Sequence, residues 1–285
     1  MSVAKKPTDE SKQRSDSSSE RVFGLLDLFT VDKPVWTVDT LLEQKDLARA
    51  TIYRYVKALV GAGFLAPVGG GGYGLGPRFV EMDRQIRIAD PLLRVAPMVM
   101  SKLRDQVAGS QLLCSYYGLR VLCVLQDRTD PRITSSFERG RPLSLFRGAP
   151  SRVILANLPT HQLQRIFLHD APEIAASGLG ENWIGFRDKL KAVRAIGYAA
   201  TSEIDKTLLG VAAPIFFAPG AVSASLCLVR LRKEVNDKDI ALLAKLAMEA
   251  CETISAHLQN GKTHQSKEIG TKHNQARKSK RASID

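Results

Sequence analysis

Three features that define large classes of proteins are scarce or missing in this 285-residue chain. It has only four cysteines, Cys114, Cys123, Cys227 and Cys251, and none is close enough to another in sequence to form a metal-binding pair. This argues against a disulfide scaffold or a structural zinc site, and it favours reduced thiols in an apolar core. No apolar run approaches the ~18 residues that span a membrane, and the N-terminus lacks the apolar segment of a signal peptide. We therefore expect a cytoplasmic protein that binds no metal, carries no cofactor and has no membrane partner.

Side chains with catalytic chemistry are also few. Between residues 109 and 258 the only histidines are His161, His169 and His257, each on a predicted helix without an acid–base partner at a local spacing. Ser151 lacks the glycine frame of a nucleophile elbow. The glycines of residues 69–74 match a dinucleotide-binding fingerprint, but a strand and a turn follow them where that fingerprint needs a helix. We predict that the chain is not an enzyme and has no catalytic residue.

Positive charge, in contrast, is in excess, with a formal net charge of +12. Residues 21–83 hold equal numbers of basic and acidic side chains, whereas residues 259–285 are strongly basic. Residues 1–19 and 259–285 have little apolar content, so we predict that both are disordered tails. The basic tail would either add non-specific affinity for phosphates or only keep the protein soluble.

The most informative stretch is residues 38–65, which predicts two short helices joined by a tight turn. Thr37 is placed to cap the first helix, and Gly63 to end the second in a left-handed conformation. In the second helix an apolar stripe predicts the buried face: it consists of Ile52, Tyr55, Val56 and Leu59. This layout is that of a helix-turn-helix, whose second helix enters the major groove of DNA.

A predicted hairpin follows, with residues 64–68 and 73–75 as strands and Gly69 to Gly72 at its tip, which makes the domain a winged helix-turn-helix. Residues 47–80 contain four basic side chains and no acidic one, an asymmetry that suits contact with phosphates. The alternative is that the polar face of the second helix is only a solvated surface. The residues predicted to contact DNA are Arg49, Ala50, Thr51, Tyr53, Arg54 and Lys57 on the helix, and Gly71 and Tyr73 on the wing.

The rest of the chain predicts a linker helix and an α/β domain. Residues 84–108 are expected to form the linker, with interruptions at Pro91 and Pro97. Strands are expected at 112–117, 121–126, 132–137, 211–217 and 222–231, and helices at 149–157, 160–169, 182–196 and 236–258. The predicted division is a tail at 1–19, a DNA-binding domain at 20–83, a linker at 84–108, an effector-binding domain at 109–258 and a basic tail at 259–285.

From about residue 19 to residue 258 the chain resembles the IclR family of bacterial transcriptional regulators. The resemblance rests on the segments SERV at 19–22, ATIYR at 50–54, AGFL at 62–65, YGLGPR at 73–78, GRPL at 140–143, ILANLP at 154–159, IGYA at 196–199 and AAPI at 212–215. It implies a two-domain α+β fold, in which a linker helix joins the winged helix-turn-helix to a GAF-like domain that binds a small effector. It also implies a homodimer or homotetramer acting as a repressor or an activator.

The resemblance further implies which residues line the effector site: Gly148, Ala149, Ser151, Glu203, Asp205, Gly210, Cys227 and Val229. Four arginines near the predicted entrance, Arg139, Arg141, Arg147 and Arg152, suggest an organic acid, because a guanidinium matches a carboxylate. The alternative is that these arginines are exposed or pair with Glu138 and other acidic residues.

The predicted function is therefore that of a sequence-specific, ligand-responsive DNA-binding regulator, with double-stranded DNA and a small molecule as partners. The alternative is a sensor-domain protein that binds DNA non-specifically through the basic tail.

Overall fold

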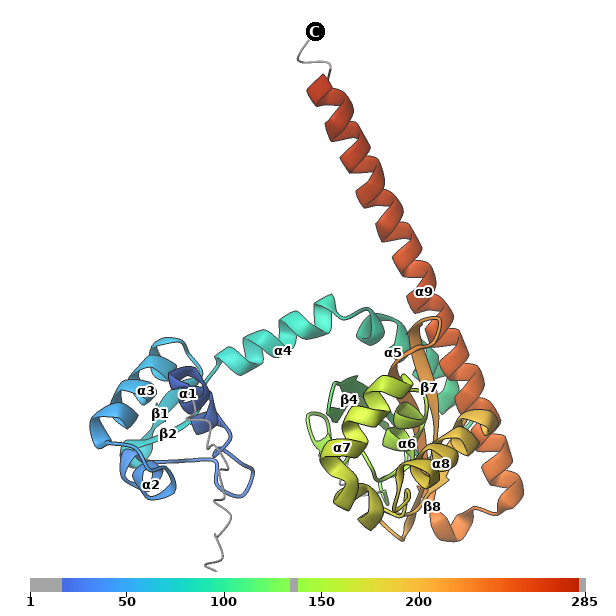
Figure 1. Ribbon diagram of the computed structural model, residues 1–285, viewed down its shortest axis with the longest axis horizontal. Helices are drawn as coiled ribbons and strands as arrows, with labels where there is room; N and C mark the ends of the chain where they lie inside the picture. The colour runs from blue at the N-terminus through green and yellow to red at the C-terminus, as the bar shows by residue number, and fades with distance from the viewer. Residues whose placement is uncertain (1–16, 134–137, 282–285) are drawn as a thin grey trace, which may run out of the picture. The chain divides into compact units, whose positions relative to one another are not determined.

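The computed structural model describes residues 17–133 and 138–281, which divide into two compact units between Ala89 and Asp90 (Figure 1). The first unit holds three helices, a hairpin and a fourth helix. Its elements are α1 (Ser18–Leu26), α2 (Val38–Gln44), α3 (Arg49–Gly61), β1 (Leu65–Val68), η1 (Gly69–Gly71), β2 (Gly72–Leu75) and α4 (Arg78–Ala89). This order is the predicted winged helix-turn-helix.

Local sequence signals set the ends of these helices. Ser17 and Thr37 each cap a helix, and each forms a reciprocal capping box, Ser17 with Glu20 and Thr37 with Thr40. Gly63 has a φ of 76° after α3, as the left-handed cap requires. The turn between α2 and α3 needs no such conformation, since only glycines have positive φ among the described residues.

The core of this unit lies where the three helices meet the base of the hairpin. Its fully buried members include Leu25 on α1, Leu41 on α2 and Ile52 on α3. Trp36 joins the hairpin as an extra bridge opposite Tyr73, with backbone N–H donated to backbone oxygen in both directions at 3.0 and 2.8 Å. The hairpin is thereby fixed to the segment that precedes the helix-turn-helix.

The linker is interrupted at Pro91, as expected for residues 84–108. It consists of two helices, α4 and α5 (Pro91–Arg104), and only α5 belongs to the second unit. Pro91 disfavours a helical conformation at the residue before it, and Asp90 instead caps α5 by accepting a hydrogen bond from Leu92 N–H at 2.8 Å. The interruption expected at Pro97 is wrong, because α5 continues through it.

The second unit is built on one six-stranded antiparallel sheet, in the order β5-β4-β3-β8-β7-β6. The strands are β3 (Ser110–Tyr117), β4 (Arg120–Arg128), β5 (Pro142–Leu143), β6 (Ala199–Thr201), β7 (Leu208–Ala218) and β8 (Ala221–Leu231). The helices are α6 (Ala149–Ala156), α7 (Thr160–Ala176), α8 (Trp183–Ile196) and α9 (Asp237–Arg281), with a short turn η2 (Arg232–Glu234) before α9.

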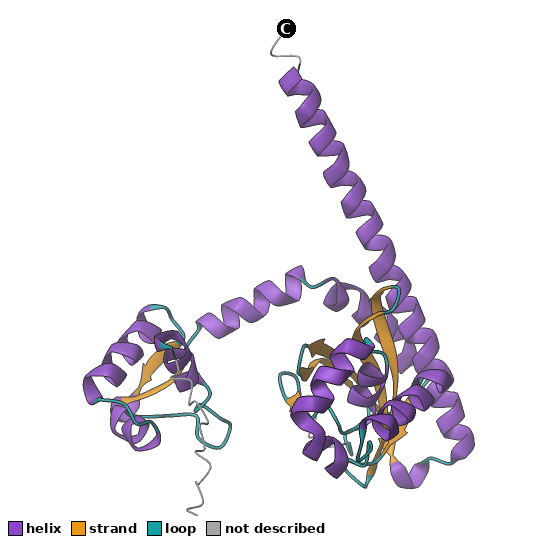
Figure 2. Ribbon diagram, in the orientation of Figure 1, coloured by secondary structure: helices purple, strands orange, loops and turns teal. Residues whose placement is uncertain are grey.

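Helices cover both faces of this sheet, so the unit has three layers (Figure 2). On β3, for example, Leu112 packs into the cluster beneath α6, α7 and α8, whereas Leu113 packs into the cluster beneath α5 and α9. This alternation follows from the period of two in a strand. The predicted α+β, two-domain fold with a GAF-like second domain is confirmed.

One local expectation in this unit is wrong. Arg132 and Ile133 do not begin a strand, since Arg132 forms ion pairs with Asp130 and Glu234 in a turn; residues 134–137 of that predicted strand lie outside the described part. Helix α9 is assigned as far as Arg281, so it runs into the segment predicted as a basic tail.

Two classes of site are missing from the described ranges. No helix there is long and apolar enough to cross a membrane. The same ranges contain no group of three or more histidine, cysteine, aspartate or glutamate side chains arranged to hold a metal ion.

Candidate functional site

Helix α3 divides cleanly into a buried face and an exposed face. The predicted apolar stripe is buried, at 5% exposure or less for each of its four residues. On the other side Tyr53 is half exposed, and Arg54 and Lys57 are exposed, so these side chains are free to reach another molecule. Arg49 and Ala50 are exposed at the start of the helix, and Thr51 is half-buried. The helix thus presents a polar, basic surface on a rigid base.

The two arginines on this surface have different partners. Arg49 forms an ion pair with Asp39 of α2, and hydrogen bonding to that carboxylate raises the pKa of the guanidinium. Arg54 has no acidic partner within residues 17–133 and 138–281, and it lies beside the ring of Tyr55, with 5.5 Å between its guanidinium carbon and the ring centroid. An arginine without an acidic partner does not have to break an ion pair before it binds a phosphate or a base edge.

The wing residues differ in position. Gly71 is exposed at the hairpin tip with a φ of 74°, which leaves the backbone open to close approach. Tyr73 is half-buried, packs against the core of the unit and is held by its bridge to Trp36. Tyr73 therefore positions the wing.

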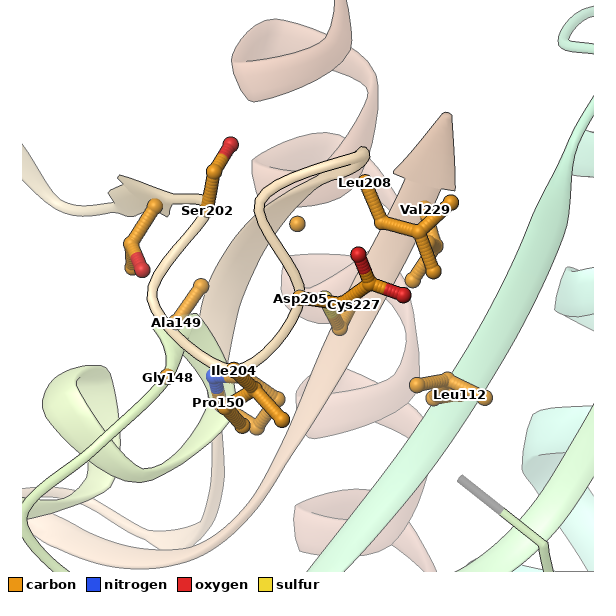
Figure 3. Close-up of a pocket in the computed structure, with 12 residues that line it drawn as sticks. Leu112, Gly148, Ala149, Pro150, Ser202, Ile204, Asp205, Leu208, Cys227 and Val229 are labelled. Carbon is orange, nitrogen blue, oxygen red and sulfur yellow. The ribbon is translucent and has the colours of Figure 1, made fainter. Parts of the chain in front are cut away.

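The second unit contains a small cavity between its sheet and the start of α6 (Figure 3). Its volume is about 30 Å³, which holds at most about two water molecules. The floor comes from adjacent strands, because Leu112 on β3 faces Cys227 on β8, and Val229 on β8 faces Gly210 on β7. The complete lining is Leu112, Gly148, Ala149, Pro150, Thr201, Ser202, Ile204, Asp205, Leu208, Gly210, Cys227 and Val229.

Two glycines shape this cavity. Gly148 has a φ of 84°, a conformation that favours glycine, and a Cβ there would lie 2.5 Å from Cδ1, the far end of the Ile204 side chain. A Cβ on Gly210 would lie 3.2 Å from Sγ of Cys227, so any larger residue would fill the floor.

Residues 202–207, named the strap here, form another side of the cavity through Ser202, Ile204 and Asp205. Figure 3 shows the Asp205 carboxylate extending from the strap toward Leu208 and Val229. Its Oδ1 accepts hydrogen bonds from the hydroxyl and the backbone N–H of Thr207, at 2.6 and 2.8 Å, and these bonds lower its pKa. Asp205 is therefore an anion at neutral pH. Burial raises the pKa of the Cys227 thiol well above its ordinary value, so Cys227 is neutral there.

Glu203 joins the strap to α6. Its Oε2 accepts a hydrogen bond from the backbone N–H of Gly148 at 3.2 Å, and its Oε1 accepts one from Nη2 of Arg152. Both side chains of this ion pair are partly shielded, with 23% of Arg152 and 32% of Glu203 exposed. The ion pair links the cavity wall to the entrance of the helix beside it.

Most of the predicted effector residues meet at this cavity. Six of the eight line it, Glu203 touches its wall at Gly148, and Ser151 is fully buried in α6 outside the lining. Sequence reasoning missed the remaining half of the lining: Leu112, Pro150, Thr201, Ser202, Ile204 and Leu208. The inward alternation of β3 could have found Leu112.

The four arginines do not gather around a ligand space. Arg152 pairs with Glu203, Arg147 donates to the Ala176 carbonyl at 3.2 Å, and Arg139 donates to the Val124 carbonyl. Arg141 is exposed, and none of the four lines the cavity. Among the alternatives, the structure favours exposed or internally paired arginines.

Comparison with known proteins agrees with both units. The family model described as the IclR helix-turn-helix domain matches residues 18–69, and the one described as the C-terminal domain of the bacterial transcriptional regulator IclR matches residues 89–256. A protein of Halobacterium salinarum named "Probable HTH-type transcriptional regulator ArcR" is 27% identical over 235 residues, which cover 78% of this chain and 87% of that one.

Solved structures share the fold. An IclR transcriptional regulator from Alicyclobacillus acidocaldarius matches with a TM-score of 0.69 and 17% identity, over 85% of this chain and 98% of that one. An IclR homologue from Microbacterium hydrocarbonoxydans, complexed with 4-hydroxybenzoate, matches with a TM-score of 0.67 and 20% identity, over 86% of this chain and all of that one. The chain therefore belongs to the IclR family of bacterial transcriptional regulators, which bind DNA through a helix-turn-helix domain, carry an effector domain and are not enzymes.

Proposed function

We propose that this protein binds a specific, two-fold-symmetric DNA site as a dimer or a pair of dimers, and that a small organic acid bound in the cavity alters this binding. The observation that carries the proposal is the exposed face of α3, where Tyr53, Arg54 and Lys57 stand on a buried base. Side chains on such a helix read base edges in the major groove. Chromosomal DNA as the partner makes the cytoplasm the place of action.

Support for a symmetric dimer comes from α4, which has no buried residue. Phe79, Met82 and Ile86 lie along one side of this helix, and Ile86 is 52% exposed. A second copy that covered this stripe would bring two recognition helices to two half-sites. Tetramers would extend the same symmetry.

Support for the organic acid comes from a relative and from the site itself. The homologue from Microbacterium hydrocarbonoxydans is complexed with 4-hydroxybenzoate. In this chain the backbone N–H of Gly148 and the guanidinium of Arg152 already hold a carboxylate, that of Glu203. The effector acts by binding one arrangement of the dimer better than another, and whether it represses or activates depends on where the site lies relative to the promoter.

The test is selection of genomic DNA fragments by the purified protein at about 150 mM salt, which suppresses non-specific binding. The double variant Arg54→Ala/Lys57→Ala is the matched control. We expect a symmetric motif that the control does not recover. Motif-free, salt-sensitive binding that survives in the control would contradict the proposal.

The competing function is non-specific binding through the basic segment after residue 259. A protein truncated after Asn260 separates the two. If the truncated protein selects the same motif, the C-terminal segment does not recognise the DNA sequence. If the truncated protein no longer binds DNA, binding depends on the basic segment and the competing function is supported.

A further inference from the structure

The effector cavity is too small for an organic effector in the arrangement that the structure shows. Ligand pockets usually measure about 300–1,000 Å³, whereas this cavity measures about 30 Å³. Part of its wall must therefore move before a ligand enters. This inference rests on the proposed function in taking the cavity as the effector site.

The strap is the wall that can move with the least loss of packing. The floor strands and α6 belong to the buried core: Ala149, Val153 and Cys227 are at most 2% exposed. On the strap, Glu203, Ile204, Lys206 and Thr207 are exposed. Segments with few buried contacts open at low free energy.

One carboxylate fastens this wall to the helix. Glu203 is the strap residue that accepts hydrogen bonds from α6 and its cap, from Arg152 and from the Gly148 N–H. Two nearby polar atoms, Nε of Arg152 and Oγ of Ser202, are buried and have no hydrogen-bond partner among the described residues. Glu203 accepts a hydrogen bond from Nη2 of Arg152 and leaves Nε unpaired. A ligand carboxylate that accepted from both nitrogens would therefore bind Arg152 with one more hydrogen bond than Glu203 does.

We propose that Glu203 is an internal competitor of the effector and sets its charge class. Its carboxylate holds the strap closed on Arg152 and Gly148. When the strap opens, a carboxylate ligand takes the place of Glu203 and keeps the strap open. A neutral ligand that displaced Glu203 would leave the guanidinium of Arg152 partly buried and unpaired, which is costly. At Arg152 an acid is therefore favoured over a neutral molecule of the same shape, whereas the Asp205 carboxylate in the lining disfavours a second negative charge on the ligand.

Hydrogen exchange of the strap amides in the full-length protein tests the competitor without knowledge of the natural effector. In Glu203→Gln the peptide covering residues 200–208 should exchange about fivefold faster than in the wild type, the fold-change that loss of a partly shielded ion pair gives. The matched control is Asp127→Asn. Its carboxylate is 19% exposed and pairs with an arginine, Arg104 of α5, on a part of the sheet that does not hold the strap. Equal strap exchange in Glu203→Gln and in the control overturns the proposal.

Sodium acetate, which reproduces the end of the Glu203 side chain, tests the exchange of carboxylates. Acetate should speed strap exchange in the wild type relative to sodium chloride at the same ionic strength, and Arg152→Gln should abolish the difference. Equal exchange in the two salts for both wild type and Glu203→Gln contradicts replacement by a ligand carboxylate.

DNA binding measured in the same two salts separates this inference from the proposed function. If the strap responds to acetate and DNA binding does not, Glu203 competes as proposed but the cavity does not control DNA binding. If organic acids change DNA binding and the strap never responds, the proposed function stands and the competitor role of Glu203 is wrong.

Discussion

At the scale of single residues, Asp39 decides how much positive charge α3 offers to DNA. It lies at the start of α2 and pairs with Arg49 on the exposed side of the helix-turn-helix. Both side chains are more than half exposed, so the pair contributes little to folding. Its larger effect is to neutralise a basic group beside the recognition surface.

Asp39→Asn should therefore strengthen DNA binding while changing the free energy of unfolding by less than about 1 kcal/mol. The freed Arg49 would contact one more phosphate, so the slope of log affinity against log salt should steepen by about 0.9. Fluorescence anisotropy with a selected DNA fragment, measured across a salt series, gives this slope.

The control is Asp32→Asn, which removes the same charge from an exposed position of the same unit. If both variants steepen the slope equally, the effect is one of net charge, and the release of Arg49 is not its cause.

The residues of the site could be predicted from the sequence to different extents. The buried and exposed faces of α3 follow directly from the 3.6-residue period, which is a local property. The ion pair of Asp39 with Arg49 and that of Glu203 with Arg152 join different elements, and no local spacing reveals them. The same holds for Arg147 and Arg139, because each donates to a backbone carbonyl that only the fold brings near.

At the scale of elements, α8 shows how one helix anchors the outer layer of the second unit. Its Phe186 is fully buried and lies 5.7 Å from Phe167 of α7, measured between ring centroids. Trp183, one turn earlier, contacts both rings. Aromatic pairs at this separation contribute beyond the area they bury.

We expect Phe186→Ala to lower the free energy of unfolding by about 3–5 kcal/mol, because it leaves a cavity in this aromatic cluster. Trp183 lies within the cluster, so its fluorescence during urea denaturation reports the change. Ile184→Ala is the control on the same helix, where the side chain is 63% exposed and the expected change is below about 0.5 kcal/mol. A loss at Phe186 no larger than that at Ile184 would show that the cluster repacks.

Elements were predictable where their own pattern was strong. The long strands and helices of the second unit appear near their expected positions, whereas the edge strands β5 and β6 were missed because each has only two or three residues. An interruption of the linker was expected at both of its prolines, and the structure has one only at Pro91. Pro91 starts a helix, where its missing N–H costs nothing, and Pro97 lies within the same helix at an exposed position.

At the scale of the whole molecule, the proposed assembly depends on the apolar side of α4. Ile86 and Ile88 are exposed to similar extents, 52% and 57%, but two helical residues apart they point in nearly opposite directions. Ile86 shares its side of the helix with Phe79 and Met82, and Ile88 does not.

Ile86→Lys should therefore weaken self-association by at least about tenfold and weaken binding to a two-fold-symmetric site, whereas Ile88→Lys should change neither. Analytical ultracentrifugation of both variants measures the association, and anisotropy on the selected DNA measures the binding. If both variants weaken self-association equally, or if neither weakens it, the dimer contact does not lie on the Ile86 side of α4.

The small closed cavity also has a consequence in time. If the strap must open before a ligand enters, the observed binding rate rises with ligand concentration only until it equals the rate of opening, and then stays constant. Above that concentration, the delay before the regulator responds is set by the protein. A rise in effector concentration that lasted for less time than this delay would not change DNA binding. The strap would therefore make the regulator respond only to effector that stays present for longer than the opening time.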